Sequence, residues 1–148
     1  MLQQANVPIP EQLTFVPINF KTEPIETGLL DADFDKQRTT LFIWEGVTYY
    51  LPLEAVNETL NAVKLNAPAG STICFDYMTE AVPSAYAAEP FQFWIAPEMI
   101  EAFLAERGYS LEEHLTAEDI VRKYLTFPDG SVAGKTLPFF YFVQASVK

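Results

Sequence analysis

The sequence predicts an α/β fold in which the sheet is parallel at first and ends in an antiparallel pair. Short apolar runs alternate with segments of helical periodicity, which is the succession that produces a parallel sheet. Towards its end the chain becomes rich in aromatic and β-branched residues, which favours antiparallel pairing there. Since 148 residues make about one domain, we expect residues 1–148 to form a single domain.

The first third of the chain is predicted to hold two strands with a short helix between them. Leu13–Phe20 combines β-branched and aromatic residues in a short run, which suits a strand. Glu23–Leu30 is predicted to be a short helix, and the polar stretch after it is rich in turn residues. Thr40–Trp44 is apolar on both pleat faces, which is typical of a central parallel strand that is covered on both sides.

The middle of the chain is predicted to alternate helix and strand. Pro52 suits the first turn of a helix, which continues with apolar residues at helical spacing until the turn at residues 67–70. Ser71–Phe75 is a short buried strand that contains the only cysteine, Cys74, and we expect this thiol to be buried. Met78–Trp94 lacks periodicity and is predicted to be a loop or a lid.

The last third of the chain is predicted to hold two helices and two strands. One helix opens at Pro97 and stops at Gly108. The pattern at residues 116–119 resembles a capping box and precedes a short helix at Ile120–Leu125. The predicted strands are Tyr109–Leu115 and a closing strand, Leu137–Val143.

The charge balance excludes several classes of partner. The formal net charge is -11, and no cluster of Lys or Arg offsets it, so we expect neither nucleic acid nor an anionic membrane surface as a partner. No segment approaches the roughly 20 apolar residues that span a bilayer. Residues 1–10 lack the features of a signal peptide, and the cytoplasm is therefore the expected location.

A long ordered match identifies a resemblance. Leu41–Met78 reads LFIWEGVTYYLPLEAVNETLNAVKLNAPAGSTICFDYM, with WEGVTYYL closing one strand, PLEAV opening a helix, an APAGS turn and FDYM closing the next strand. This segment is similar to the middle of the leucine carboxyl methyltransferase family, and the flanking segments fit as well. The resemblance implies the later part of a Rossmann-like class I methyltransferase sheet, S-adenosyl-L-methionine as the cofactor, and O-methylation of a small-molecule or peptide carboxylate.

The family's main cofactor-binding elements have no counterpart before Leu13. The six glycines do not form a Gly-x-Gly turn, and an acidic residue after a second strand is also missing. We therefore expect the chain alone to be truncated, to bind the cofactor weakly, and to be inactive or weakly active. The alternative is a non-catalytic assembly or small-ligand-binding module derived from the same fold. The missing neighbours leave an open edge at Thr40–Trp44, which predicts a homo-oligomer.

Two pairs of residues are candidates for cofactor binding. The resemblance places Asn19 and Phe20 at the adenine, although the family tends to have an acid at the first position, and a turn Asn at the end of a strand explains the residue equally well. Glu45 and Gly46 follow the central strand, where the resemblance implies the methionine and methyl-transfer region. Glu45 could hold a cationic amino group or cap the following turn. Gly46 allows a positive φ or close approach of a ligand.

The candidate catalytic residues are two tyrosines. Tyr49 and Tyr50 could orient a substrate carboxylate through their hydroxyls, or they could be core aromatics with solvated hydroxyls. Asp76 and Tyr77 end the next strand and could line the substrate side. His114 is the only histidine, which rules out a multi-histidine metal site, and we expect no metal.

Overall fold

The computed structural model describes residues 8–20, 22–81 and 89–148. Its sheet has four strands: β1 (Leu41–Trp44), β2 (Thr72–Met78), β3 (Tyr109–Leu115) and β4 (Phe140–Val147). They lie in the order β1-β2-β4-β3. β1 pairs with β2 in parallel, whereas β4 is antiparallel to both β2 and β3. This arrangement confirms the predicted α/β sheet, parallel at first and antiparallel at its end.

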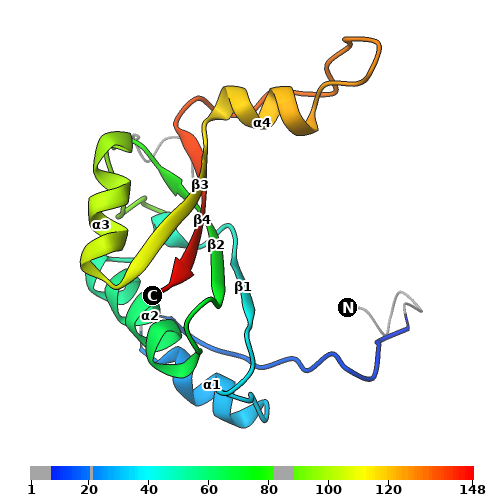
Figure 1. Ribbon diagram of the computed structural model, residues 1–148. Helices are drawn as coiled ribbons and strands as arrows, with labels where there is room; N and C mark the ends of the chain where they lie inside the picture. Colours follow the sequence, from blue (N-terminus) through cyan, green and yellow to red (C-terminus); the bar gives the residue numbers. More distant parts are fainter. Residues whose placement is uncertain (1–7, 21, 82–88) are drawn as a thin grey trace.

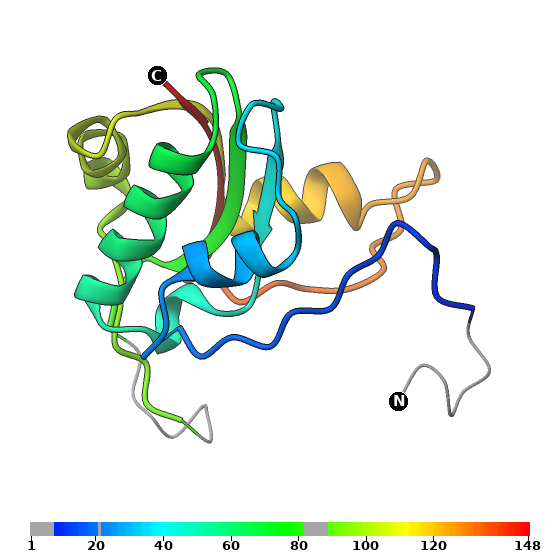
Figure 2. The same cartoon turned by 90° about the horizontal axis from the view of Figure 1, so that it is seen from below.

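Three helices cover one face of the sheet. They are α1 (Ile25–Asp31), α2 (Leu53–Asn66) and α3 (Ile100–Glu106), and short 3₁₀ turns, η2 (Thr48–Tyr50) and η4 (Pro97–Met99), precede the last two. Figures 1 and 2 show α1, α2 and α3 on the same side, while α4 (Ala117–Tyr124) lies at one end of the sheet. Among the described residues no helix packs across the opposite face. We call the two faces the helical face and the open face.

The hydrophobic core lies between the helical face and helices α2 and α3, whereas α1 has no buried residue. Val56, Leu60 and Val63 of α2 are at most 1% exposed, which confirms the helical spacing seen in the sequence. They pack in one cluster with Ile73 and Phe75 of β2. None of the described helices combines the length and the apolar character that crossing a membrane requires.

The predicted first strand is wrong. Leu13–Phe20 forms no β-ladder, and Figure 1 shows it as a coil that does not join the sheet. Pro17 cannot donate a backbone hydrogen bond, and Phe15 is 62% exposed. Some of the apolar side chains pack locally instead, since Val16 and Ile18 approach Gly28 of α1.

The other sequence predictions need smaller corrections. The closing strand begins at Phe140 rather than at Leu137, after Pro138, and it continues to Val147. Cys74 is only partly buried, because its strand has no helical cover on the open face. The predicted loop begins after Met78, which belongs to β2, and residues 82–88 of it lie outside the described residues.

The capping box is confirmed. Thr116 caps α4 by accepting a hydrogen bond from the Asp119 backbone, and Asp119 accepts one from the Thr116 backbone in return. These bonds satisfy backbone donors that the first turn of a helix leaves free. They explain why the helix starts at Ala117, three residues before the predicted position.

Candidate active site

The candidate site lies where β1 ends beside the parallel strand β2, which continues to Met78. Trp44, the last residue of β1, is paired in register with Phe75 of β2. Glu45 therefore follows one strand at the level at which Asp76 lies on the other. The carboxyl ends of parallel strands are the place where open α/β sheets bind ligands.

A hydrogen bond joins the two strand ends. The backbone N–H of Gly46 donates to Oδ1 of Asp76 over 2.9 Å. Gly46 has a φ of +75°, in the left-handed region that favours glycine, so the chain turns here at little cost. The turn continues into Thr48, whose hydroxyl donates to the backbone carbonyl of Asp76. Two independent bonds thus fix the loop after β1 to β2.

Asp76 is a buried carboxylate at this junction. It is only 6% exposed. Burial raises the pKa of Asp76, the nearby negative charge of Glu45 raises it further, and the hydrogen bond from Gly46 opposes them. Buried acids with such shifts are concentrated at functional sites.

Tyr49 and Tyr50 follow within the same turn. The Tyr49 ring is 8% exposed and packs edge-on against Phe140, at 5.0 Å between centroids. Its hydroxyl oxygen lies 4.0 Å from the position that a Cβ at Gly46 would occupy. Burial, followed by the charge of Asp76, raises the pKa of Tyr49 to about 12. Tyr49 is thus a core aromatic with its hydroxyl beside the strand junction, whereas Tyr50 is half-buried.

Asn19 and Phe20 lie beside the end of β1. The Phe20 ring stacks on Trp44, with 6.3 Å between centroids and 30° between planes. Asn19 is exposed, and its backbone carbonyl accepts hydrogen bonds from Thr22 and Glu23, so it forms a turn before α1. Nε1 of Trp44 is buried without a hydrogen-bond partner among the described residues. An unpaired buried donor is uncommon in folded proteins.

A cavity opens from the strand ends along the open face. Its volume is about 740 Å³. Three acidic residues line it: Glu45, Asp76 and Glu113. Apolar and aromatic side chains form the rest of the wall, including Ile43, Leu115, Ile120, Tyr124 and Phe142. The described residues contain no cluster of three or more His, Cys, Asp or Glu that could hold a metal ion.

Sequence reasoning found part of this site. It placed Asn19, Glu45 and Asp76 at the carboxyl ends of strands. The hydrogen bond from Gly46 brings the loop that contains Glu45 to Asp76, which lies inside β2, whereas Asn19 lies in a coil and ends no strand. It missed Glu113 and the contribution of α4, because the position of α4 depends on tertiary packing. The one signal that could have found Glu113 is its place in a predicted strand that pairs with the sheet.

The sequence comparisons identify relatives of the chain. The profile of the leucine carboxyl methyltransferase family matches residues 1–64. A Bacillus subtilis (strain 168) protein, YktD, is 31% identical over 134 residues, which cover 80% of this chain. Both matches support the assignment of the chain to the leucine carboxyl methyltransferase family. YktD carries a provisional description as an S-adenosyl-L-methionine-dependent methyltransferase, and the chain spans 44% of its length.

The solved structures agree with this family assignment at the level of the fold. Human N-acetylserotonin methyltransferase in complex with S-adenosyl-L-methionine aligns with a TM-score of 0.50 and 12% identity. The alignment covers 97% of this chain and 36% of the human protein. The four-stranded sheet of this chain thus has the class I methyltransferase fold, as the sequence predicted.

Proposed function

We propose that the chain forms the acceptor side of the active site of an S-adenosyl-L-methionine-dependent O-methyltransferase. The observation that carries this proposal is the Gly46–Asp76 hydrogen bond, which holds two parallel strand ends together at the mouth of an acidic cavity. The family assignment supports the methyltransferase class. The comparisons do not favour a non-catalytic module.

Several residues fit parts of the cofactor. The carboxylates of Glu45 and Asp76 suit its cationic sulfonium and ammonium groups, and Gly46 presents no Cβ beside them. Nε1 of Trp44, which has no hydrogen-bond partner among the described residues, offers a donor for adenine, and the neighbouring Phe20 ring offers an aromatic surface, with Asn19 next to them. The sequence contains no Gly-x-Gly turn, so we propose that these groups bind only part of the cofactor.

The cofactor and the protein have separate tasks in methyl transfer. S-adenosyl-L-methionine, when bound, supplies a methyl group on a sulfur that is already a good leaving group. The protein's task is to align the acceptor oxygen and exclude water, which are effects of position and desolvation. We assign the alignment to the hydroxyls of Tyr49 and Tyr50 and the exclusion of water to the apolar cavity wall.

The acceptor we propose is the carboxylate of a small molecule or peptide, in line with the family's description. A second candidate is a hydroxyl group, because the cavity is lined by three acids that repel a carboxylate. A hydroxyl must lose a proton on methylation. Asp76 could accept this proton, since burial raises its pKa towards the working pH of a general base.

The stability of the product to alkali separates these candidates. The native gene product is incubated with S-adenosyl-L-methionine labelled in the methyl group and with a cell extract as the source of acceptor. A carboxyl acceptor gives a methyl ester, which alkali hydrolyses to volatile labelled methanol. A hydroxyl acceptor gives an ether that retains its label in alkali. Absence of any transfer to oxygen would overturn the proposal.

We also propose that the chain forms a homo-oligomer through β1. This strand lies at the edge of the sheet, and Leu41 and Ile43 on it are 59% and 71% exposed. Apolar edge strands promote pairing between chains. Sedimentation equilibrium should show association that Ile43→Lys abolishes. A monomer over the whole concentration range contradicts this proposal.

A further inference from the structure

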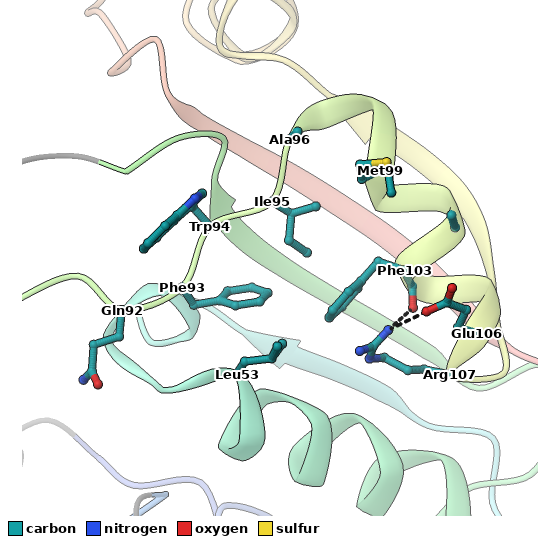
Figure 3. Close-up of a pocket in the computed structure, with 11 residues that line it drawn as sticks. Leu53, Gln92, Phe93, Trp94, Ile95, Ala96, Met99, Phe103, Glu106 and Arg107 are labelled. Carbon is teal, nitrogen blue, oxygen red and sulfur yellow. Dashed lines mark hydrogen bonds and ion pairs between the residues drawn. The ribbon is translucent and has the colours of Figure 1, made fainter.

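A second cavity lies in the outer layer of helices, where the segment at residues 92–96 is hydrogen-bonded to the backbone carbonyls of Tyr49, Tyr50 and Met78. It has a volume of about 400 Å³ and runs between the start of α2, the segment at residues 92–96, and α3. Figure 3 shows Phe93, Ile95 and Phe103 converging at its centre, with Trp94 and Met99 at the rim. We call this cavity the outer groove.

The outer groove gathers large apolar side chains that remain accessible. Leu53, Trp94 and Met99 all line it, and they are 44%, 48% and 55% exposed. Phe93 beneath them is 4% exposed and packs on Phe103 at 5.8 Å between ring centroids. The groove therefore has a rigid aromatic floor and an apolar rim, which suits a hydrocarbon or aromatic body.

One end of the outer groove is cationic. Arg107 lies with its Cζ atom 3.5 Å from the centroid of the Phe103 ring. Its Nε donates to Oδ1 of Asn57 over 2.8 Å, and its Nη1 donates to the carbonyl of Phe103 over 2.7 Å. These bonds fix the guanidinium at the cavity wall. No described residue accepts a hydrogen bond from its Nη2.

A polar cavity continues from this end. It has a volume of about 360 Å³, shares Glu106 and Arg107 with the outer groove, and is also lined by Asn57, Asn61 and Lys64. Lys64 lines the same cavity as Arg107, and its Nζ would lie 2.5 Å from a Cβ at Gly108, the residue that follows Arg107. Two of the chain's nine Lys and Arg residues thus line one cavity beside an apolar groove, in a protein of net charge -11.

We propose that the outer groove binds a small amphipathic organic anion. Its aromatic or aliphatic body lies between Trp94, Met99 and Phe103, and its anionic head group lies at Arg107 and Lys64. Charge complementarity supports this occupant, because a positive end on an otherwise acidic protein selects an anion. The outer groove shares no lining residue with the acidic cavity on the open face, so we assign the anion to a second ligand site and not to the methyl acceptor of that cavity.

A pair of matched fluorescent probes tests this proposal. 8-Anilinonaphthalene-1-sulfonate is an amphipathic aromatic anion, and N-phenyl-1-naphthylamine has the same body without the charge. We expect the anion to bind the chain more tightly than the neutral probe. Arg107→Met should weaken binding of the anion at least about tenfold, as expected for loss of one charge-assisted contact, and leave the neutral probe unchanged. Arg122→Met, which removes an exposed charge from α4, is the control.

Three further variants keep the test decisive if Arg107→Met does not fold. Lys64→Met should weaken binding of the anion. Glu106→Gln should strengthen it, because Oε2 of Glu106 lies 3.6 Å from Nη1 of Arg107 and competes with the ligand for the guanidinium. Trp94→Phe should reduce energy transfer from tryptophan to the bound anion, which locates the probe in the outer groove. Equal affinity for the two probes, or equal effects of Lys64→Met and Arg122→Met, would overturn the proposal.

Discussion

The two faces of the sheet differ although the same strands build them. On the helical face, Trp44 of β1 is 7% exposed and packs in the core, whereas its neighbour Ile43 on the open face is 71% exposed. The helical face therefore holds the fold together, and the open face carries the cavity with its acidic residues. A strand that carries apolar residues on both faces, such as β1, can therefore be buried on one face only.

The sharpest test of this comparison is a matched pair of leucine truncations. Leu60→Ala on the helical side removes a side chain that is 0% exposed and should lower the free energy of unfolding by about 2–5 kcal/mol. Leu41→Ala on the open side, where 59% of the residue is exposed, should lower the free energy of unfolding much less. Chemical denaturation measures both. Equal losses would mean that the open face is covered in solution.

Substitution of Gly46 tests whether the turn after β1 requires a positive φ. Gly46→Ala places a side chain at a φ of +75°, which should cost about 1–2 kcal/mol of unfolding free energy. Gly134→Ala is the control, because its φ is not positive and no atom lies within 4 Å of the added Cβ. Thermal unfolding compares the two variants, and an unchanged melting temperature for Gly46→Ala contradicts the strained turn.

Two Tyr→Phe substitutions compare a buried hydrogen bond in the core with an exposed hydroxyl on α4. The Tyr109 hydroxyl donates to the carbonyl of Leu60 over 2.6 Å in the buried core. Tyr109→Phe should therefore lower the unfolding free energy by about 0.5–1.5 kcal/mol. Tyr124→Phe on α4, where the residue is 66% exposed, should have no measurable effect. Similar effects of both changes in urea denaturation would show that the buried bond contributes nothing.

Substitution of Asp76 should raise the free energy of unfolding, in contrast to the substitutions above. Because burial raises its pKa, the folded state binds its proton more readily than the unfolded state, and the charged form costs stability at neutral pH. Asp76→Asn keeps an oxygen acceptor for Gly46 and removes the charge, so the variant should be slightly more stable than wild type at pH 7. This advantage should shrink as the pH falls through the raised folded pKa towards 3.8, the ordinary value. Denaturation curves across this range provide the check, and a variant less stable at pH 7 would contradict it.

Local sequence signals predicted most of the fold. The apolar spacing of α2, the capping box at Thr116 and the stop at Gly108 depend on neighbouring residues, and all three appear in the structure. The strand predicted at Leu13–Phe20 failed because its composition says nothing about whether a partner strand is available. The start of β4 was misplaced because Pro138 ends the pairing that the aromatic run before Phe140 suggested.

The candidate site could be predicted only in part. Glu45 and Gly46 follow β1, and Asp76 lies near the carboxyl end of β2, so a general rule for parallel sheets located them. The bond between Gly46 and Asp76 needs the register of two strands 30 residues apart, and the burial of Trp44 Nε1 without a partner among the described residues needs the packing of Phe20 against it. Neither follows from local sequence.

The most direct test of the proposed methyl-transfer site is the turnover of the native gene product with labelled S-adenosyl-L-methionine. Glu45→Gln and Asp76→Asn should each lower kcat/KM at least about tenfold, because both carboxylates lie at the joined strand ends. Glu101→Gln, an exposed acid on α3, should leave kcat/KM unchanged, and so should His114→Ala provided the variant folds. Full activity in both Glu45→Gln and Asp76→Asn would contradict the assignment of this junction as the site of methyl transfer.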